Sequence, residues 1–281
     1  MDISNENEIV FDPYVPHFGK VISVSYSAFD TYPIPKTSAS FNYVYCGLRD
    51  EQNQLMTDEK LINRFENTLA NIVQRERIVK WRSILKNFIP SNVIEMLFKR
   101  NEEGGRREKW KFDMDVFMKK KNILSSGQKI IFYIISEIVS NIRLDSLILY
   151  DEPETHLHPN AITELMNTLY ELVDEFQSYC ILATHSPLII RELMSKNVFV
   201  VDKDENVPTI RRIGLESFGE NLTVLTDEVF GNKEVPKQYK TIVKSLIAQG
   251  KNYEQILELL EFDDQPLSLN VRLFIKSLII N

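Results

Sequence analysis

Two adjacent carboxylates stand directly after a short apolar segment near the middle of the chain. Residues 147–150 have the sequence L-I-L-Y, and Asp151 and Glu152 follow them without a gap. An all-apolar run of this length predicts a strand buried on both faces, as in a parallel sheet covered by helices. Open sheets of that kind bind ligands beyond the carboxyl ends of their strands, where this pair would lie. The chemistry that suits the pair is hydrolysis of a magnesium-bound nucleotide.

The two carboxylates would have different tasks in such a reaction. Asp151 would hold Mg²⁺, because this ion prefers carboxylate oxygens and keeps much of its hydration. Glu152 would orient or deprotonate the attacking water, a task worth roughly 10²–10⁴-fold in rate. Pro153 then ends the strand, because proline has no backbone donor for the ladder. Taken alone, the same residues suit an acidic turn after a structural strand about equally well.

A second candidate site precedes the carboxylates at residues 124–128, which have the sequence L-S-S-G-Q. An amphipathic run follows and predicts a helix over residues 129–141. Ser125 or Ser126 suits the N-cap of that helix, and Gly127 lets an anion approach the backbone. Free N–H groups at a helix N-terminus bind phosphate well. Taken alone, an ordinary capped helix explains this pattern better than a binding site does.

A histidine provides the third candidate, because it follows another apolar segment. Residues 179–183 predict a strand, and His185 comes two positions after its end. A histidine at that place can reach a terminal phosphate and sense whether it is present. A single histidine at a strand end is more often a structural turn residue, so its interpretation depends on the other two segments.

The order and spacing of the three segments resemble the ATP-binding cassette (ABC) ATPase superfamily. Residues 124–128 resemble its signature motif, usually L-S-G-G-Q, with Ser126 in place of a glycine. Residues 147–152 resemble Walker B with its catalytic glutamate, and His185 matches the switch histidine. Residues 154–159 match the D-loop region, and their sequence, E-T-H-L-H-P, is most similar to soluble SMC-like and OLD-like ATPases.

The resemblance implies ATP and Mg²⁺ as ligands and a pair of heads that sandwich the nucleotides. Asp151 would be the metal ligand, and Glu152 and His185 would be the catalytic residues acting on the nucleotide of their own head. The partner would be a second copy, in a homodimer or a higher oligomer. The implied nucleotide-binding residues are Leu124, Ser125, Ser126, Gly127, Gln128 and His158.

A glycine-rich phosphate loop of the form G-x-x-x-x-G-K-[ST] is absent from these 281 residues. Gly19 and Lys20 come nearest, but Tyr14 stands where the first glycine should be, and Val21 follows the lysine. In the family this loop precedes the motifs found here, so the chain resembles the later part of such an ATPase. We expect the loop to come from an upstream segment or another polypeptide. Alternatively, the chain is a non-hydrolysing scaffold or inhibitor derived from such an ATPase.

These motifs predict an α/β fold with an ABC-ATPase-like parallel sheet flanked by helices, without the N-terminal lobe that carries the phosphate loop. Additional strands are expected at 20–26, 41–45, 197–202 and 209–213. Four regions are expected: a remnant of the N-terminal lobe with strands and loops (1–57), a helical insertion (58–121), the ATPase core with the three motifs (122–235) and a helical tail (236–281).

The composition is typical of a soluble globular protein, with 43% hydrophobic and 26% charged residues. Apolar runs stay well short of the roughly 20 residues that span a membrane. The acidic, polar start of the chain does not resemble a secretory signal. Cys46 and Cys180 suggest neither a disulfide framework nor a metal site. We therefore expect a cytoplasmic protein without a membrane partner.

Residues 60–129 form a basic segment in an acidic chain. They contain 17 Lys and Arg against 8 Asp and Glu, whereas the whole chain carries a net charge of −7. Such a segment suits a contact with nucleic acid, although a solvated helical face is the simpler interpretation. An SMC-like DNA-repair head remains an alternative, but residues 58–100 are too short for its long coiled coil. The candidate contact residues are Arg75, Arg77, Lys80, Arg82 and Lys86.

Residues 215–231 resemble a segment in the ATPase subunits of the Septu and retron antiphage systems. This resemblance implies an ATPase that regulates a bacterial antiphage defence complex and gates an effector nuclease. The tail ends in an unusually apolar stretch at residues 273–280. That stretch would dock such a partner or pack on the chain's own core. A Toprim-like acidic cluster does not follow the core, so an OLD-type nuclease lacks its second domain here.

Overall fold

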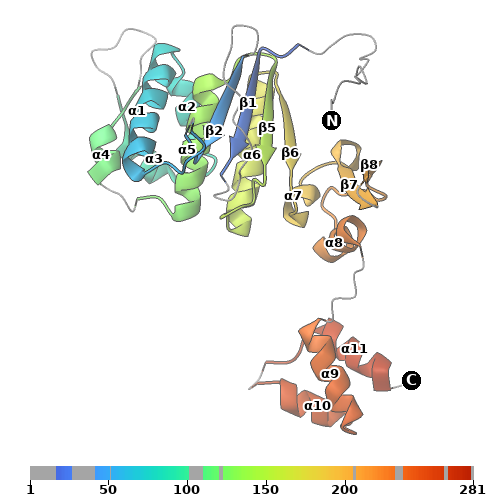
Figure 1. Cartoon of the computed structure of the whole chain (residues 1–281). Helices are drawn as coiled ribbons and strands as arrows, with labels where there is room; N and C mark the ends of the chain where they lie inside the picture. Colours follow the sequence, from blue (N-terminus) through green and yellow to red (C-terminus); the bar gives the residue numbers. More distant parts are fainter. Residues whose placement is uncertain are drawn as a thin grey trace. The chain divides into compact units, whose positions relative to one another are not determined.

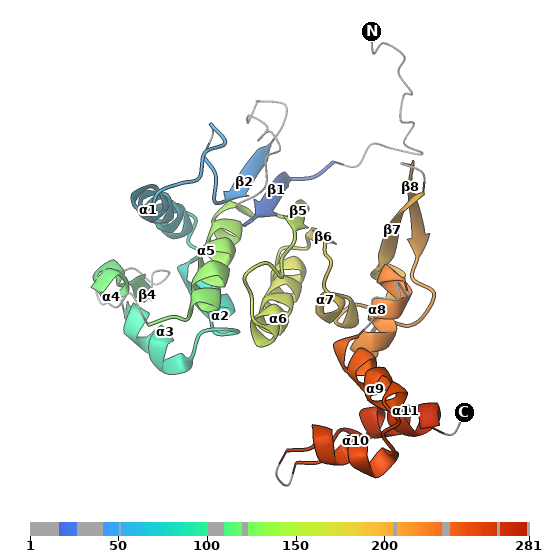
Figure 2. The ribbon, with the colours of Figure 1, turned by 60° about the horizontal axis from the view of Figure 1, so that its bottom comes forward.

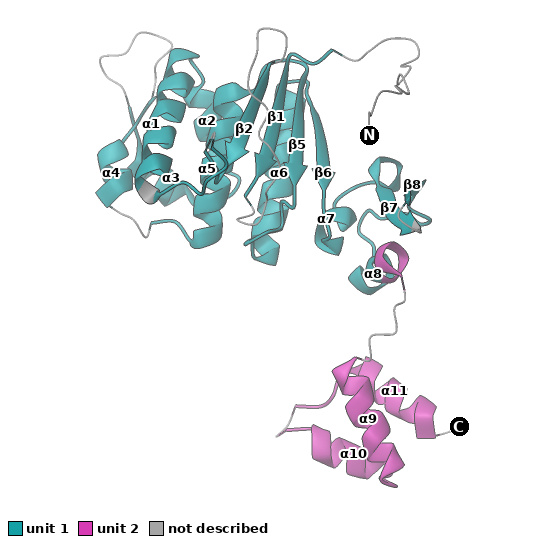
Figure 3. Cartoon of the chain, in the orientation of Figure 1, with its two compact units in different colours: residues 1–226 teal, residues 227–281 magenta. Residues whose placement is uncertain are grey.

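The computed structural model describes residues 17–26, 42–50, 52–100, 110–119, 123–204, 207–231, 237–262 and 265–279. The chain divides into two compact units, Met1–Thr226 and Asp227–Asn281 (Figure 3). Residues 1–16 and 101–109 are among those that lie outside the described residues. The division falls inside one helix, whereas the sequence predicts a boundary between residues 235 and 236.

A four-stranded parallel sheet forms the centre of the first unit (Figure 1). All three pairings between neighbouring strands are parallel. The α/β class and the parallel sheet flanked by helices are therefore confirmed. In their order across the sheet the strands are β2 (Tyr43–Gly47), β1 (Lys20–Ser25), β5 (Ser146–Asp151) and β6 (Tyr179–Ala183).

One face of the sheet packs against helices to form the main core. Figure 2 shows α5 and α6 side by side beneath the strands. Ile22 and Ile148 are fully buried in this layer, and Trp81 donates from Nε1 to the Ser136 hydroxyl at 3.0 Å. Trp81 is thus a core residue. The helices that contact the strands are α5 (Ser126–Asn141) and α6 (Pro159–Glu175). The helices α1 (Asp58–Gln74) and α2 (Ile78–Leu85) pack on them.

The opposite face of the sheet is only partly covered, and this corrects the prediction for residues 147–150. Burial alternates along β5, with Ile148 and Tyr150 buried and Leu147 and Leu149 partly exposed. In Figure 1, α6 lies behind the strands, and none of the described helices lies in front of β5 and β6. An all-apolar sequence predicted two packed faces, but the described residues provide a helical layer for one of them.

The predicted helical insertion contains helices and a small antiparallel pair of strands that the sequence did not predict. Thr57 caps α1 by accepting from Lys60 N–H, and Asp58 is the first helical residue. Ser91 likewise begins its helix, and Pro90 stands at the N-cap. The additional elements are α3 (Ser91–Leu97), β3 (Phe98–Arg100), β4 (Trp110–Phe112) and α4 (Met114–Lys119).

The first unit continues through a hairpin, which confirms the two strands predicted near residues 197–213. β7 (Phe199–Asp204) pairs antiparallel with β8 (Val207–Arg212). Before the hairpin come α7 (Pro187–Arg191) and a 3₁₀ turn at Ser195–Asn197. After it comes α8 (Leu222–Phe230), the helix in which the division between the two units falls.

The second unit is a small helical bundle, which confirms the predicted helical C-terminal region. Its core consists of Val243, Ile256 and Ile275, one from each helix and each fully buried. None of the described helices in either unit is long and apolar enough to cross a membrane. The three helices are α9 (Gln238–Ala248), α10 (Tyr253–Leu260) and α11 (Leu269–Ile279).

Candidate functional site

The two candidate carboxylates lie at the carboxyl end of β5, where the apolar run ends. Asp151 is the last residue of the strand, and Glu152 has a positive φ of 44°. Residues other than glycine rarely adopt this left-handed backbone conformation. Residues that do adopt it concentrate at functional sites. Glu152 N–H donates to the Ala183 carbonyl at 2.9 Å, which holds the turn against the end of β6.

Glu154 joins the loop after β5 to the loop after β6. One carboxylate oxygen accepts from His185 N–H at 2.8 Å, and the other accepts from the Thr184 hydroxyl at 2.8 Å. Ser186 N–H in turn donates to the Thr184 hydroxyl at 2.9 Å. Bonds to a charged acceptor are stronger than those between neutral groups. The bridge therefore brings the candidate catalytic residues Glu152 and His185 to one edge of the sheet.

Sequence reasoning assigned no individual role to Glu154, although it lies within the D-loop match. Its sequence signal was its place four residues beyond the end of the predicted strand. Glu152 has a partner within its own loop, because the Thr155 hydroxyl donates to its Oε2 at 3.3 Å. Both carboxyl groups are partly exposed, and His185 is exposed. The site is therefore open to a ligand from solution.

The predicted signature segment forms the N-terminus of α5, and the structure decides between its two candidate caps. Ser125 is the N-cap: its hydroxyl accepts from Gln128 N–H at 3.2 Å, and the Gln128 side chain accepts from Ser125 N–H at 3.0 Å. This reciprocal pair is a capping box. Gln128 also donates to the Phe88 carbonyl at 2.9 Å. The Gln128 amide thus has a structural task. Ser125 and Ser126 are exposed, and Leu124 is buried.

The beginning of α5 packs beside the beginning of α6. A Cβ at Gly127 would lie 3.7 Å from both Ala161 Cβ and Leu157 Cδ2, which is ordinary contact. His158 is the N-cap of α6, with Nδ1 accepting from Asn160 N–H at 3.4 Å, and its side chain is exposed. The structure therefore brings the predicted signature and D-loop segments together at two neighbouring helix N-termini.

A cavity of about 300 Å³ lies beside the N-terminal half of α5. Ser126 and Lys129 of α5 line it together with His156 of the D-loop segment. Asp151 and Glu152 do not contribute to its lining. The cavity thus lies beside the start of α5, and the carboxylate pair is not part of it.

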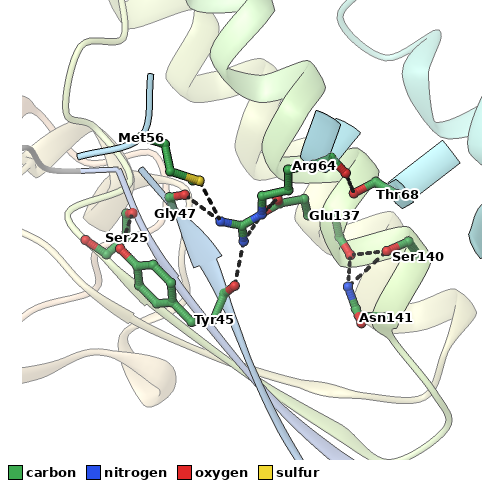
Figure 4. Close-up of polar contacts among 9 residues, drawn as sticks. All are labelled: Ser25, Tyr45, Gly47, Met56, Arg64, Thr68, Glu137, Ser140 and Asn141. Carbon is green, nitrogen blue, oxygen red and sulfur yellow. Dashed lines mark hydrogen bonds and ion pairs between the residues drawn. The ribbon is translucent and has the colours of Figure 1, made fainter. Parts of the chain in front are cut away.

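A buried ion pair borders the same cavity and joins three elements (Figure 4). Arg64 of α1 pairs with Glu137 of α5 and donates to the carbonyls of Tyr45, at 2.6 Å, and Gly47, at 3.0 Å, in β2. Burial raises the pKa of Glu137 to about 7, and the guanidinium acts in the opposite direction. The cluster ties α1 and α5 to the end of β2.

Three of the five basic residues proposed for a nucleic-acid contact have partners within the chain. Arg77 donates to the Val139 carbonyl, and Lys80 pairs with Glu175. The Arg82 guanidinium lies 3.8 Å from the centroid of the Trp110 ring. These contacts occupy part of the basic face, and a nucleic-acid contact there stays a prediction.

A match to a known protein family covers these candidate residues. Residues 32–190, more than half of the chain, match the family described as the AAA ATPase domain. The chain belongs to the AAA ATPase domain family. The matched stretch contains the candidate residues at the ends of β5 and β6 and at the start of α5. Membership supports a general ATPase function and implies nucleotide use, usually with Mg²⁺. The assignment of residues 124–128 as an ABC signature stays a prediction.

A curated relative matches nearly the full length of this chain. Protein ea59 of Escherichia phage lambda is 30% identical to it over 99% of this chain and 56% of the relative. The chain thus spans about half the length of the relative that it matches. The activity, substrates and partners of the whole protein are therefore matters of proposal.

Proposed function

We propose that this chain supplies the hydrolytic carboxylates, the phosphate-sensing histidine and the signature segment of an ATP-hydrolysing protein. The observation that carries the proposal is the joining of the loops after β5 and β6. Glu152 N–H donates to the Ala183 carbonyl, and Glu154 accepts from Thr184 and His185. These bonds hold two candidate catalytic groups at the carboxyl end of a parallel sheet, where such folds bind ligands.

The donor set at this edge fits Mg²⁺. Asp151 would hold the ion, because Mg²⁺ in nucleotide sites takes one or two carboxylates, several waters and the phosphates of the substrate. Among the described residues, no group of three or more acidic, histidine or cysteine side chains could hold a metal. When bound, the ion would neutralise charge on the phosphate oxygens.

The protein side chains would act mainly by positioning. Phosphoryl transfer to water requires an oriented nucleophile and stabilised charge, and little covalent chemistry by the enzyme. Glu152 would align the water and accept its proton, and His185 would donate to the terminal phosphate. Glu154 is a positioning residue in this scheme, because it acts through the backbone of the loop that carries His185.

The signature segment would serve a second head. Ser125 and Ser126 are exposed at the first turn of α5, and a helix N-terminus favours phosphate oxygens. In this scheme each copy presents α5 to the nucleotide of the other copy in a homodimer. Closing and opening of that dimer would follow binding and hydrolysis of ATP.

We infer further that the ATPase regulates an antiphage defence complex and gates an effector nuclease. Support comes from the resemblance of residues 215–231 to the ATPase subunits of Septu and retron systems. Much of that stretch is α8. The test is a phage challenge of cells that express the native gene, with wild-type and Glu152→Gln alleles compared. Equal plaque counts for the two alleles and the empty vector would remove the defence role.

A non-hydrolysing scaffold or inhibitor is the second candidate function. It is favoured by the lack of a G-x-x-x-x-G-K-[ST] sequence in these 281 residues. It is disfavoured by the bonded arrangement of Glu152 and Glu154, which a scaffold does not require. A scaffold would leave ATP turnover in its complex unchanged when Glu152 is replaced.

The deciding experiment uses the natively expressed protein with its bound partners. Glu152→Gln should lower ATP turnover by roughly 10²–10⁴-fold while nucleotide is retained, because the general base is lost and the binding groups remain. The matched control is Glu254→Gln, an exposed glutamate in the second unit, which should leave turnover unchanged. Equal turnover in wild type and Glu152→Gln would refute the catalytic assignment.

A further inference from the structure

The helical bundle of the second unit carries charges of opposite sign on two of its helices. Lys237, Lys240 and Lys244 follow one another at spacings of three and four residues from the N-cap of α9. Residues at these spacings lie on one side of a helix. Residues 237–251 contain no acidic side chain. We call the three lysines the basic stripe, and a stripe of this kind attracts an acidic surface.

The next helix, α10, carries the opposite charge. Glu254 and Glu258 lie one turn apart, and Glu261 follows at the C-cap of the helix. Residues 252–262 contain no basic side chain. We call the three glutamates the acidic stripe. Each stripe extends over two helical turns, about 10 Å, so the two stripes match in length.

The two stripes do not neutralise each other within the bundle. Among the described residues, Glu261 is the one member of either stripe that has an ion-pair partner, Arg272 of α11 at 2.6 Å. Two lysines and two glutamates of the stripes are exposed. The exposed charges of both signs are therefore available to a partner molecule.

Exposed apolar side chains accompany the stripes. Leu269 and Leu273 lie one turn apart on α11 and are 71% and 55% exposed, and Leu259 of α10 is 57% exposed. The ammonium group of Lys240 lies 5.3 Å from the centroid of the Phe274 ring, so the basic stripe borders α11. Exposed ion pairs contribute little free energy to association, whereas burial of apolar surface contributes much of it. The bundle thus offers both the charges that orient a partner and the apolar side chains that hold it.

We propose that this surface binds the same surface of a second copy of the chain about a two-fold axis. The basic stripe of each copy would lie against the acidic stripe of the other, and the exposed leucines would be buried between them. A two-fold contact is self-complementary, so both stripes of both copies are paired at once. The contact requires no nucleotide, and it is separate from the pairing of two heads around ATP. It therefore goes beyond the proposed function and does not depend on it.

Charge complementarity favours a second copy over other partners. Nucleic acid or an anionic lipid surface would attract the basic stripe, but the acidic stripe of the same small bundle would repel it. A different protein would need a basic and an acidic stripe of matching length, and a second copy carries both. Chains tethered through their second units would also meet head to head at a raised effective concentration.

The test measures self-association of the full native protein in EDTA without nucleotide. Sedimentation equilibrium of a dilution series gives the dissociation constant. The acidic-swap variant carries Lys237→Glu with Lys244→Glu, and the basic-swap variant carries Glu254→Lys with Glu258→Lys. All four replaced side chains are exposed, so the circular dichroism of both variants should match that of the wild type.

Each swap variant alone should associate roughly tenfold or more weakly than the wild type, because like charges then face each other. An equimolar mixture of the two variants should associate as tightly as the wild type, because every stripe again meets its opposite. Glu254→Gln removes a single charge and should change the dissociation constant less than about fivefold.

The matched control is Glu66→Lys with Glu95→Lys, two exposed glutamates of the first unit that give the same change in net charge as the basic swap. This control should associate like the wild type, and so should Glu152→Gln, whose result separates this inference from the catalytic assignment. A wild-type protein that stays a single copy in EDTA would overturn the proposal. Swap variants that associate like the wild type, or a mixture that does not recover, would also overturn it.

A further outcome would assign the basic stripe to a different partner. If the acidic swap releases a co-purified nucleic acid or another protein chain while self-association is unchanged, the two-fold contact is refuted. Absorbance at 260 nm and mass spectrometry of the purified variants report these losses.

Discussion

The two edge strands of the sheet, β2 and β6, are completed in different ways. At β2, Arg64 donates to the carbonyls of Tyr45 and Gly47 while it pairs with Glu137, so polar groups of the edge are satisfied within the chain. At β6, Tyr179 and Ile181 are more than half exposed, and the following loop carries His185. One edge is closed by a side chain from α1, and the other has no such cover from the described residues.

This difference separates residues that stabilise the fold from residues that serve its chemistry. The Arg64–Glu137 pair is largely removed from solvent, and its partners come from three elements of the same unit. Glu152 and Glu154 are partly exposed, and their bonds link loops rather than helices. We therefore expect substitutions at the β2 edge to change stability, and those at the β6 edge to change activity.

The largest effect on stability should come from Arg64→Met at the closed edge. The substitution leaves the buried Glu137 charge without its cation. The free energy of unfolding should therefore fall by about 3–5 kcal/mol at pH 8. Urea denaturation measures it. Lys60→Met, which breaks the exposed pair with Asp50, is the control and should behave like wild type. If the two variants unfold at the same urea concentration, the β2 edge is not held as described.

At the open edge, Glu154→Ala should change activity far more than stability. Hydrogen bonds to a charged acceptor are worth about 1.5–3 kcal/mol, so ATP turnover of the native complex should fall roughly 10–100-fold as His185 loses its position. The fall should appear in kcat more than in KM. Glu154→Gln keeps one acceptor and should recover part of the rate. A change in melting temperature as large as that of Arg64→Met would contradict the separation of the two edges.

The pH dependence of stability should also distinguish the edges. The pKa of Glu137 is about 7 in the folded chain, above its ordinary value of 4.5. A raised folded pKa contributes stability that is fully present below about pH 4.5 and is lost as the pH rises through 7. Chemical denaturation between pH 5 and 8 should show this decline in wild type and not in Glu137→Gln. Parallel curves for the two proteins would exclude Glu137 as its source.

The smallest effect should separate two neighbouring serines at α5. Ser125→Ala removes the capping hydroxyl and should lower the free energy of unfolding by about 1 kcal/mol. Ser126→Ala should leave stability unchanged and weaken ATP-dependent dimerisation, because Ser126 is proposed to face the nucleotide of the other head. Thermal melting and light scattering with ATP measure the two properties. Reversal of the two results would exchange the roles of the serines.

The elements that carry the motifs were predictable because each has a strong local pattern. β5, β6 and α5 follow from uninterrupted apolar runs or helical periodicity, with Pro153 and Ser125 marking their ends. Long-range pairings gave no such signal. Arg64 and Glu137 are 73 residues apart in sequence, and neither residue alone indicates the other.

The same limit applies to the candidate site and to the open face. Asp151, Glu152 and His185 could be assigned to strand ends from sequence, but the bond that Glu154 makes with the loop after β6 spans 31 residues. The apolar sequence of residues 147–150 predicts two packed faces. The packing of α5 and α6 across the strands decides which face of the sheet the described helices cover.

The exposed strand β6 also places a demand on the cell that makes this protein. An unpaired apolar edge is a template for association with other unpaired edges, including those of nascent chains. A chain in which this edge stays uncovered would therefore be a substrate for chaperones and proteases.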